Sequence, residues 1–472
     1  MSGLWTALDA QRATGGSGVG GWDANGVAID SRQVQLGDMF VALKGPNHDG
    51  HDHLIAAFRS GASAAMVSHV PDIIAEDAPL LVVDDTQAGL EGLGRAARER
   101  FQGKVIALTG SVGKTGTKEM LSLMLSGQGK TSATLGNLNN HIGAPLTLAR
   151  LPADADYAVL ELGMNHPDEI RPLSKMVRPH VALITRIAPA HTAFFDSLDQ
   201  VADAKAEIFE GLEPGDIAIV NADDGFTDHL SAAAKRAGAT EIFRFGEASD
   251  AETRLLNVTL QPDGSAVEAT VVGRKVSYRI GAPGKHWVMN SLAALTAAVC
   301  AGADLQAAAE ALAEVHPPAG RGATEALTLP QGRITLIDES YNASPAAMRA
   351  AFAVLSAHEP GPAGRRVAVL GDMLELGGNA PREHGELGEN LAALPVDLVF
   401  AAGPEMQALV NKLRPEQRAG YAADTAALSG EIVPALRDGD VVLVKGSLGI
   451  RMARIISALR DAVASGGEPE GK

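Results

Sequence analysis

The chain has 472 residues, which at about 150 residues per domain predicts three domains. Its formal net charge of −17 argues against a nucleic-acid-binding surface, and the apolar, aromatic-poor composition favours soluble α/β layers. No apolar run reaches the ~18 residues needed to span a bilayer, and no basic stretch followed by an apolar one marks a signal peptide. The single cysteine, Cys300, excludes an internal disulfide. We therefore expect a cytoplasmic protein with no membrane insertion and no nucleic-acid partner, in which Cys300 is a small buried hydrophobe.

Residues 1–103 show short strands and turns, which predict a small α/β cap. Polar residues follow two of these strands and could hydrogen-bond a polar ligand: Asp30, Ser31, Arg32 and Lys44. Three histidines between residues 48 and 53 could suggest a metal site. The aspartates and glycine among them favour a tight solvated turn instead.

The chain is organised around residues 104–118, where a β-branched run meets a glycine-rich turn and then a helical pattern. The turn, TGSVGKT at residues 109–115, predicts a strand, a phosphate-binding loop and a helix. Leu108 stands where the full P-loop pattern has glycine. Lys114 should contact the β- and γ-phosphates, and Thr115 should offer its hydroxyl to Mg²⁺. The expected nucleotide-binding residues are Gly110, Ser111, Val112, Gly113, Lys114, Thr115 and Gly116.

From residue 104 to 321, strand and helix patterns alternate, which predicts a mostly parallel sheet with ligands at the carboxyl ends of its strands. Polar residues follow three of these strands: Glu161, His191 and the run at 221–224. Lys205 lies in an apparent helix, flanked by small residues. Taken singly, these could be a solvated carboxylate, a loop imidazole and a surface lysine.

A second set of strand and helix patterns fills residues 322–472 and predicts a doubly wound, Rossmann-like domain without its own P-loop. The Pro/Gly-rich segment 316–322 is the expected hinge, and a second hinge is expected near residue 103. The predicted architecture is therefore α/β in three domains: an N-terminal cap (1–103), a central P-loop ATPase-type domain (104–321) and the C-terminal domain (322–472).

Several motifs, in this order, resemble those of the Mur ligase family of ATP-dependent peptidoglycan-precursor ligases, over essentially the whole chain. They are TGSVGKT at 109–115, GNLNN at 136–140, IG at 142–143, ELG at 161–163, AH at 190–191, Asn290 in MNSLAA, GR at 320–321 and DESYNASP at 338–345. The second and last of them most resemble the subgroup that adds D-alanyl-D-alanine. The Asn-Pro-Arg motif of the tripeptide-forming relatives is not visible.

The resemblance implies an ATP-dependent carbon–nitrogen ligase that converts UDP-N-acetylmuramoyl-tripeptide and D-alanyl-D-alanine into the pentapeptide, ADP and phosphate through an acyl phosphate. It implies ATP and Mg²⁺ as cofactors, catalytic roles for Lys114, His191 and Lys205, and a monomer. The implied metal ligands are Thr115, Glu161, His191 and Lys205, the last carbamylated in many relatives.

The resemblance also implies contacts to ATP from Asn290, Arg321 and Asp338. The implied peptide and dipeptide contacts are Asn137, Asn139, Asn140, Asn165, Tyr341 and Asn342, with the UDP end at residues 30–32 and at Lys44. Two residues depart from the family pattern. Leu162 replaces a methionine, a conservative core change, and Ala206 replaces a glycine beside Lys205.

Two other functions compete with this one: a sister amide ligase of the same family, and a P-loop ATPase without ligase activity. The segment 341–345 and the N-terminal cap discriminate against the sister ligase. A plain ATPase would have no use for Glu161, His191 and Lys205 together. The third residue of the tripeptide is not encoded in any of these motifs.

Overall fold

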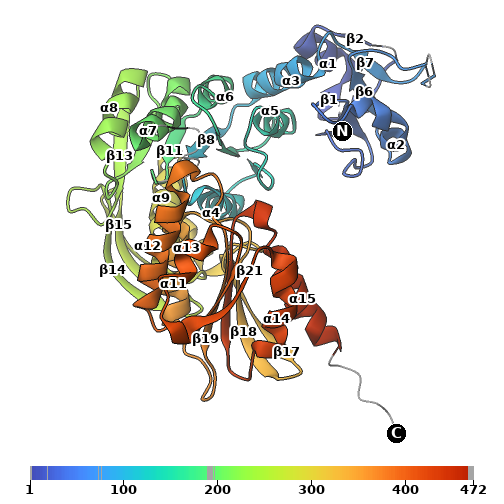
Figure 1. The fold of residues 1–472 in the computed structure, drawn as a ribbon. Helices are drawn as coiled ribbons and strands as arrows, with labels where there is room; N and C mark the ends of the chain where they lie inside the picture. The colour runs from blue at the N-terminus through green and yellow to red at the C-terminus, as the bar shows by residue number, and fades with distance from the viewer. Residues whose placement is uncertain are drawn as a thin grey trace.

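The computed structural model describes residues 3–18, 20–72, 74–75, 77–188, 195 and 197–465. Within these residues the strands form three successive groups of sheets along the chain, and helices cover them (Figure 1). The three-domain α/β architecture expected from the sequence is confirmed.

The N-terminal domain is a small α/β cap. Its five-stranded sheet has the order β2-β7-β6-β5-β4, and β2 alone is antiparallel to its neighbour. These strands are β2 (Ser17–Gly18), β4 (Gly26–Ala28), β5 (Asp38–Val41), β6 (Ala64–Val67) and β7 (Leu80–Val82), beside a short antiparallel pair of β1 (Trp5–Thr6) and β3 (Asp23–Ala24). The helices are α1 (Ala7–Thr14), η1 (Gly50–His53), α2 (Leu54–Arg59) and α3 (Thr86–Arg100).

The central domain is built on a nine-stranded sheet of order β16-β15-β14-β13-β12-β11-β8-β10-β9. All the strands that lie between β9 and β14 in this spatial order, including those two, are mutually parallel. They are β8 (Lys104–Thr109), β9 (Thr131–Ala133), β10 (Tyr157–Glu161), β11 (Val181–Ile184), β12 (Ile217–Asn221), β13 (Glu241–Gly246) and β14 (Thr253–Gln261). An antiparallel extension follows, formed by β14, β15 (Gly264–Val271) and β16 (Arg274–Ile280). The sequence analysis did not predict this extension.

Helices cover both faces of the central sheet. One face carries α4 (Lys114–Ser126), α9 (Lys285–Cys300), α10 (Leu305–Ala311) and η4 (Leu312–Glu314). The other face carries α5 (Gly143–Ala149), α6 (Ile170–Val177), α7 (Leu198–Ala206), η3 (Glu207–Gly211) and α8 (Thr227–Ala237). Along β8, Ile106 and Leu108 pack into the first layer, while Val105 and Ala107 pack into the second. This alternation is what a strand buried on both faces requires.

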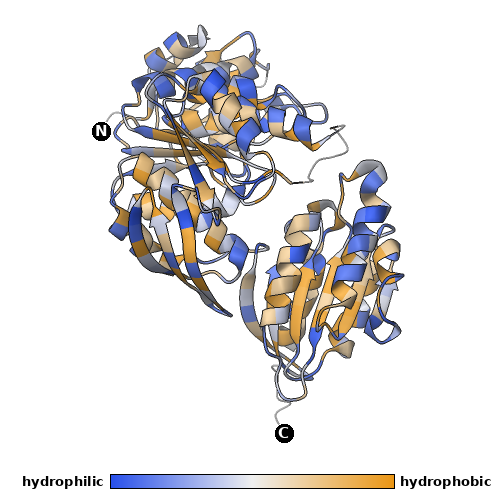
Figure 2. Cartoon of the chain, turned by 90° about the vertical axis from the view of Figure 1, so that its left-hand side faces the viewer, coloured by the Kyte–Doolittle hydropathy of each residue, from blue (hydrophilic) through white to orange (hydrophobic). Residues whose placement is uncertain are grey.

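The C-terminal domain has a six-stranded sheet of order β17-β18-β22-β19-β20-β21, parallel except for β17. The strands are β17 (Ala323–Leu329), β18 (Gly332–Glu339), β19 (Arg366–Gly371), β20 (Leu398–Ala402), β21 (Arg418–Ala422) and β22 (Val441–Lys445). Its helices are α11 (Pro345–Ala357), η5 (Gly377–Asn379), α12 (Ala380–Ala392), α13 (Met406–Val410), η6 (Pro415–Gln417), α14 (Thr425–Ala435), η7 (Leu448–Ile450) and α15 (Ala453–Ser465). Figure 2 shows apolar strands between helices whose outer faces are hydrophilic, as a doubly wound domain requires.

The N-terminal domain is fastened to the central one through α3 and α5, which lie side by side (Figure 1). The indole of Trp5 donates to the Ala149 carbonyl at 2.8 Å. The buried guanidinium of Arg98 donates to the Val177 and Arg178 carbonyls at the end of α6, at 2.7 and 2.8 Å. None of the helices in the described part of the chain has the length and apolar character to cross a membrane.

Candidate active site

A cleft of about 1020 Å³ lies between the central and C-terminal domains, at the carboxyl ends of the strands of the central sheet. Fifteen of the residues expected in the site line it: Ser111, Val112, Gly113, Lys114, Thr115, Gly116, Asn137, Asn139, Asn140, Glu161, Asn165, Asn290, Arg321, Tyr341 and Asn342. Residues that are more than 200 positions apart in the sequence therefore share one cavity.

The phosphate loop occupies the floor of the cleft between β8 and α4. Its shape depends on Gly113, whose φ of 86° is unfavourable for other residues. A Cβ at Gly113 would also lie 2.6 Å from Oδ1 of Asn290, so α9 packs directly under the loop. The neighbouring strand β11 holds the loop from the other side, because the Thr185 hydroxyl donates to the Val112 carbonyl at 2.6 Å. The sequence analysis did not identify Thr185.

Lys114 opens α4, and its ammonium group donates to the carbonyl of Gly110 at 2.6 Å. Gly110 itself is not in the cleft wall, so its contribution is this carbonyl. Burial lowers the pKa of Lys114; the carboxylate of Glu161 opposes this shift and the cation of Arg321 adds to it. Lys114, Glu161 and Arg321 are thus electrostatically coupled across the cleft, and a polyphosphate would supply the missing anion.

Glu161 ends β10 and is 2% exposed. Its Oε1 accepts a hydrogen bond from Nδ2 of Asn139 at 2.8 Å, while its buried Oε2 has no hydrogen-bond partner within the described residues. The orphaned carboxylate oxygen of Glu161 and the hydroxyl of Thr115, whose residues line the same cleft, are hard oxygen donors of the kind that Mg²⁺ prefers, so these residues fit the cation. In the described part of the chain, no three His, Cys, Asp or Glu side chains cluster closely enough to hold a metal alone.

Lys205 lies near the end of α7 and is 2% exposed. It is not part of the cleft wall. Burial, reinforced by the nearby charge of Lys114, moves the pKa of Lys205 well below its usual value. The environment of Lys205 therefore disfavours its charged form, unlike that of the surface lysine that its sequence context alone could suggest. His191, its expected partner, lies outside the described residues.

Four asparagines line the cleft next to Glu161: Asn137, Asn139, Asn140 and Asn165. Oδ1 of Asn140 accepts hydrogen bonds from the backbone N–H groups of Ile142 and Gly143 at 3.1 and 3.0 Å, so this side chain shapes the turn into α5. The main chain of Asn139 accepts from the N–H of Gly163 at 2.8 Å. The loop thus has amides available to a peptide and is itself fixed by several hydrogen bonds.

The C-terminal domain supplies the opposite wall. The guanidinium of Arg321 stacks over the ring of Tyr341, 4.1 Å from its centroid. Lys445, at the end of β22, pairs with Glu339 at 2.9 Å and donates to the carbonyl of Asn342 at 3.0 Å. Both Lys445 and Glu339 line the cleft, and the sequence analysis assigned neither of them a role.

Some expected residues are not brought to this cleft. Asp338 is 4% exposed, and its Oδ1 accepts from the N–H and hydroxyl of Ser340 at 3.1 and 2.6 Å. The residues proposed for the UDP end, Asp30, Ser31, Arg32 and Lys44, lie in the N-terminal domain. There the paired guanidinium of Arg32 lowers the pKa of Asp30 to about 2.

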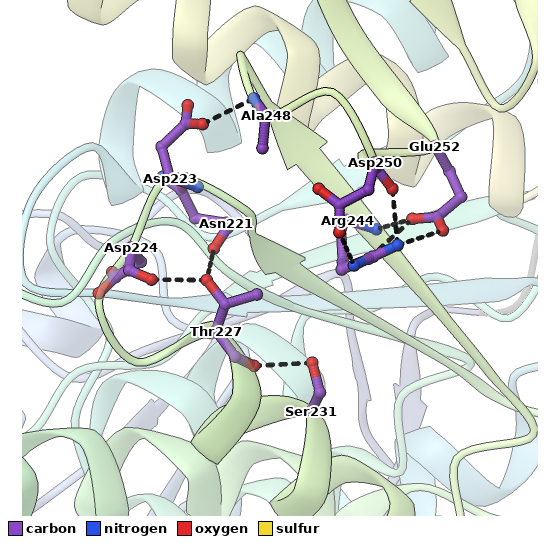
Figure 3. Close-up of polar contacts among 9 residues, drawn as sticks. All are labelled: Asn221, Asp223, Asp224, Thr227, Ser231, Arg244, Ala248, Asp250 and Glu252. Atoms are coloured by element: carbon purple, nitrogen blue, oxygen red, sulfur yellow. Dashed lines mark hydrogen bonds and ion pairs between the residues drawn. The ribbon is translucent and has the colours of Figure 1, made fainter.

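Strand β12 ends in a polar turn, of which Asn221 and Asp223 line the cleft (Figure 3). Nδ2 of Asn221 donates to the Thr185 carbonyl at 3.0 Å, and Asp224 accepts from the N–H of Ile187 at 2.6 Å. The carboxylate of Asp223 accepts from the N–H of Ala248 at 2.9 Å. The sequence pattern marked this strand end as polar without giving it a role, and the structure shows that it fixes the neighbouring strand end.

Comparison with known proteins places this site in a family. The descriptions "Mur ligase family, catalytic domain", "Mur ligase middle domain" and "Mur ligase, glutamate ligase domain" match residues 23–98, 108–298 and 325–448. The chain is 37% identical, over 438 residues, to the UDP-N-acetylmuramoyl-tripeptide–D-alanyl-D-alanine ligase of Escherichia coli, covering 92% of this chain and 93% of that protein.

Solved structures agree with the sequence match. A crystal structure of MurF from Acinetobacter baumannii superposes with a TM-score of 0.84 at 33% identity, covering 97% of this chain and 99% of the other. The MurF ligase from Thermotoga maritima in complex with ADP gives a TM-score of 0.76 at 26% identity, covering 93% and 98% of the two chains. This chain therefore belongs to the Mur ligase family.

Proposed function

We propose that this chain joins D-alanyl-D-alanine to UDP-N-acetylmuramoyl-tripeptide, consuming ATP and releasing the pentapeptide product, ADP and phosphate. The observation that carries the proposal is the shared cleft, in which the phosphate loop and Glu161 face Tyr341 and Asn342. A plain ATPase has no need of the amide-rich loop or of this second wall. The relatives that match over nine-tenths of the chain bear the name of this reaction.

The chemistry has two steps. A carboxylate oxygen of the tripeptide attacks the γ-phosphorus of ATP, ADP leaves, and an acyl phosphate forms. The free amine of the dipeptide then attacks the acyl carbon, the nitrogen loses a proton, and phosphate leaves with the electron pair of its bond to carbon. Lys114 and the loop N–H groups position the phosphates and stabilise the charge that develops on them.

Thr115 and Glu161 would hold Mg²⁺, and a second ion would lie between Glu161, His191 and Lys205. Bound there, Mg²⁺ neutralises charge on the transferred phosphoryl group. An uncharged lysine amine is the form that adds carbon dioxide, giving a carbamate and releasing a proton, and the burial of Lys205 favours that form. A carbamate would convert this lysine into an anionic oxygen ligand, which the ammonium form could not be.

The three domains divide the substrates. Residues 1–103 would take the UDP end through residues 30–32 and Lys44, and residues 104–321 would take ATP. Residues 322–472 would present the dipeptide through Tyr341 and Asn342 and would contact the nucleotide through Asp338, and Arg321 at the domain boundary would contact it as well. Asn290 would contact the nucleotide, and its position under the phosphate loop supports this role. We expect a cytoplasmic monomer.

The test is ATP-dependent phosphate release with UDP-N-acetylmuramoyl-tripeptide, measured with and without D-alanyl-D-alanine and followed by mass analysis of the product. Release that requires both substrates and yields the pentapeptide is the expected result. Release indifferent to the dipeptide would indicate the P-loop ATPase. Release that requires the UDP substrate with a different amino acid would indicate a sister ligase.

A further inference from the structure

A second lysine of the phosphate-loop helix, Lys118, is buried one helical turn beyond Lys114. It is 1% exposed and does not line the cleft. Its ammonium group donates to the carbonyls of Thr134 and Gly136 at 2.8 and 3.4 Å and pairs with Glu119 at 2.7 Å. A buried cation held mainly by backbone carbonyls is unusual, since most lysines keep their charge in water.

The carbonyls that Lys118 holds begin the amide-rich loop, residues 134–140. This loop is tied at three points to the strand end that carries Glu161. The N–H of Glu161 donates to the Thr134 hydroxyl at 3.1 Å, and Nδ2 of Asn139 donates to Oε1 of Glu161 at 2.8 Å. The N–H of Gly163 donates to the main chain of Asn139 at 2.8 Å. The loop therefore lies between α4 and the carboxylate that faces the phosphate loop.

Lys118 is the side chain of α4 that holds the first part of this loop by hydrogen bonds. Gly136 has a φ of 56°, and a Cβ there would meet nothing within 4 Å, so side-chain packing around Gly136 does not fix the turn. Removal of the Lys118 ammonium would leave the buried Thr134 carbonyl without this donor, which is costly, and would also release the part-buried Gly136 carbonyl. The loop would then relax away from α4, and Asn139 would lose its fixed position on Glu161.

We infer that Lys118 is a positioning residue: it ties the ATP-binding helix to the amide-rich loop, so that Asn139 holds Glu161 in place while the loop amides face the peptide. Helix α4, which binds the nucleotide, and the amide-rich loop, which faces the peptide, are thereby connected to each other. This inference rests on the proposed function for its kinetic readout, while its structural readout is independent of it.

The test compares Lys118→Met with Lys130→Met, which removes an exposed lysine of the same domain whose ion pair with Asp154 is on the surface. We expect Lys118→Met to lower kcat by about 10- to 100-fold, the usual range for residues that orient a ligand from behind, with the KM for ATP within about twofold. Lys130→Met should behave as the wild type.

Hydrogen exchange gives the second readout. In Lys118→Met the amide of Gly163 and those of residues 137–140 should exchange at least about tenfold faster, while the amides of β11 stay protected. In a double mutant with Asn139→Ala, kcat should fall no further than in the poorer single variant, since both changes release the same carboxylate.

Unchanged kcat in Lys118→Met, lost activity with unchanged exchange at residues 137–140, or multiplicative effects in the double mutant would each overturn the inference. If Lys118→Met does not fold, kcat and hydrogen exchange are measured for Lys118→Arg instead. This variant keeps a cation and changes only the length and shape of the side chain that reaches the Thr134 and Gly136 carbonyls. Should the wild type itself fail to make pentapeptide, the proposed function falls, and the exchange result still decides the role of Lys118.

Discussion

At the scale of single residues, Lys114 shows how the cleft is electrostatically suited to an anion. Its ammonium lies deep in the cleft on a single carbonyl, close enough to Arg321 and Lys205 for their charges to act on one another. The lowered pKa of Lys114 means that the folded state disfavours its charged form. A bound polyphosphate reverses this, because it brings negative charge to Lys114 and Arg321.

Replacement of Lys114 separates catalysis from stability. We expect Lys114→Met to lower kcat/KM by about a thousandfold or more, because a charge-stabilising donor on the transferred phosphate is lost. The melting temperature should not fall, because the variant also removes a poorly compensated buried cation. The checks are steady-state kinetics and thermal unfolding, with Lys104→Met at the exposed start of β8 as the control. Activity within tenfold of the wild type would contradict the assigned role.

Cys300 gives a second prediction at this scale. Cys300, at the end of α9, is partly rather than fully buried, and this burial raises the pKa of its thiol to about 12. A raised pKa keeps the thiol protonated at pH 8, and the thiolate is the reactive form. Native protein should therefore react with a thiol reagent at least about a hundredfold more slowly than the urea-unfolded chain. Since the chain has one cysteine, the optical signal has a single source. Equal rates in the two states would show that Cys300 is accessible.

At the scale of elements, the phosphate loop owes its shape to its neighbours as much as to its own glycines. Strand β11 contributes the Thr185 hydroxyl, and the Arg186 carbonyl accepts from the N–H of Ser111 at 2.8 Å. Helix α9 contributes Asn290 beneath Gly113. These contacts hold the loop in one conformation, and its other N–H groups would be available to a phosphate.

The contribution of β11 can be measured with Thr185→Val, which keeps the shape of the side chain and removes the donor to the Val112 carbonyl. Loss of one buried hydrogen bond should raise the KM for ATP by about three- to tenfold and leave the KM for the dipeptide unchanged. Thr259→Val on the exposed face of β14 is the matched control. Equal effects on both substrates would mean that Thr185 supports the whole domain rather than the loop.

The sequence predicted these elements unevenly, for physical reasons. The loop at 109–115 is a local pattern in which strand, glycines and lysine are consecutive, so its fold could be read directly. Strand β15 of the antiparallel extension also has a local signal, the alternation of buried Val267, Ala269 and Val271, but the sequence analysis did not predict a strand there. The pair of Lys445 with Glu339 joins residues 106 positions apart, and no local pattern encodes such a contact. The roles of the substrate-binding residues stay predictions.

At the scale of the whole molecule, the cleft belongs to two bodies joined by a short connection. The N–H of Gly322 donates to the Asp338 carbonyl at 2.8 Å, and the N–H of Tyr341 donates to the Gly320 carbonyl at 3.0 Å. Residues 320–322 are thus hydrogen-bonded to the C-terminal sheet and should move with it. The pivot would then lie in the preceding Pro317–Pro318 pair, and Arg321 would travel with the C-terminal domain.

We therefore expect ATP and the UDP-linked substrate to draw the C-terminal domain towards the phosphate loop, because Arg321 gains a phosphate partner only when its domain approaches. Small-angle scattering of the enzyme with a non-hydrolysable ATP analogue and the UDP substrate should give a smaller radius of gyration than the free enzyme. The same ligands added to Arg321→Ala should give a smaller decrease in the radius of gyration, because the variant lacks the cation that would bind a phosphate in the closed form. An unchanged scattering profile with both ligands bound, their binding verified by calorimetry, would mean that the two domains already have their working separation and that Arg321 serves catalysis from a fixed position.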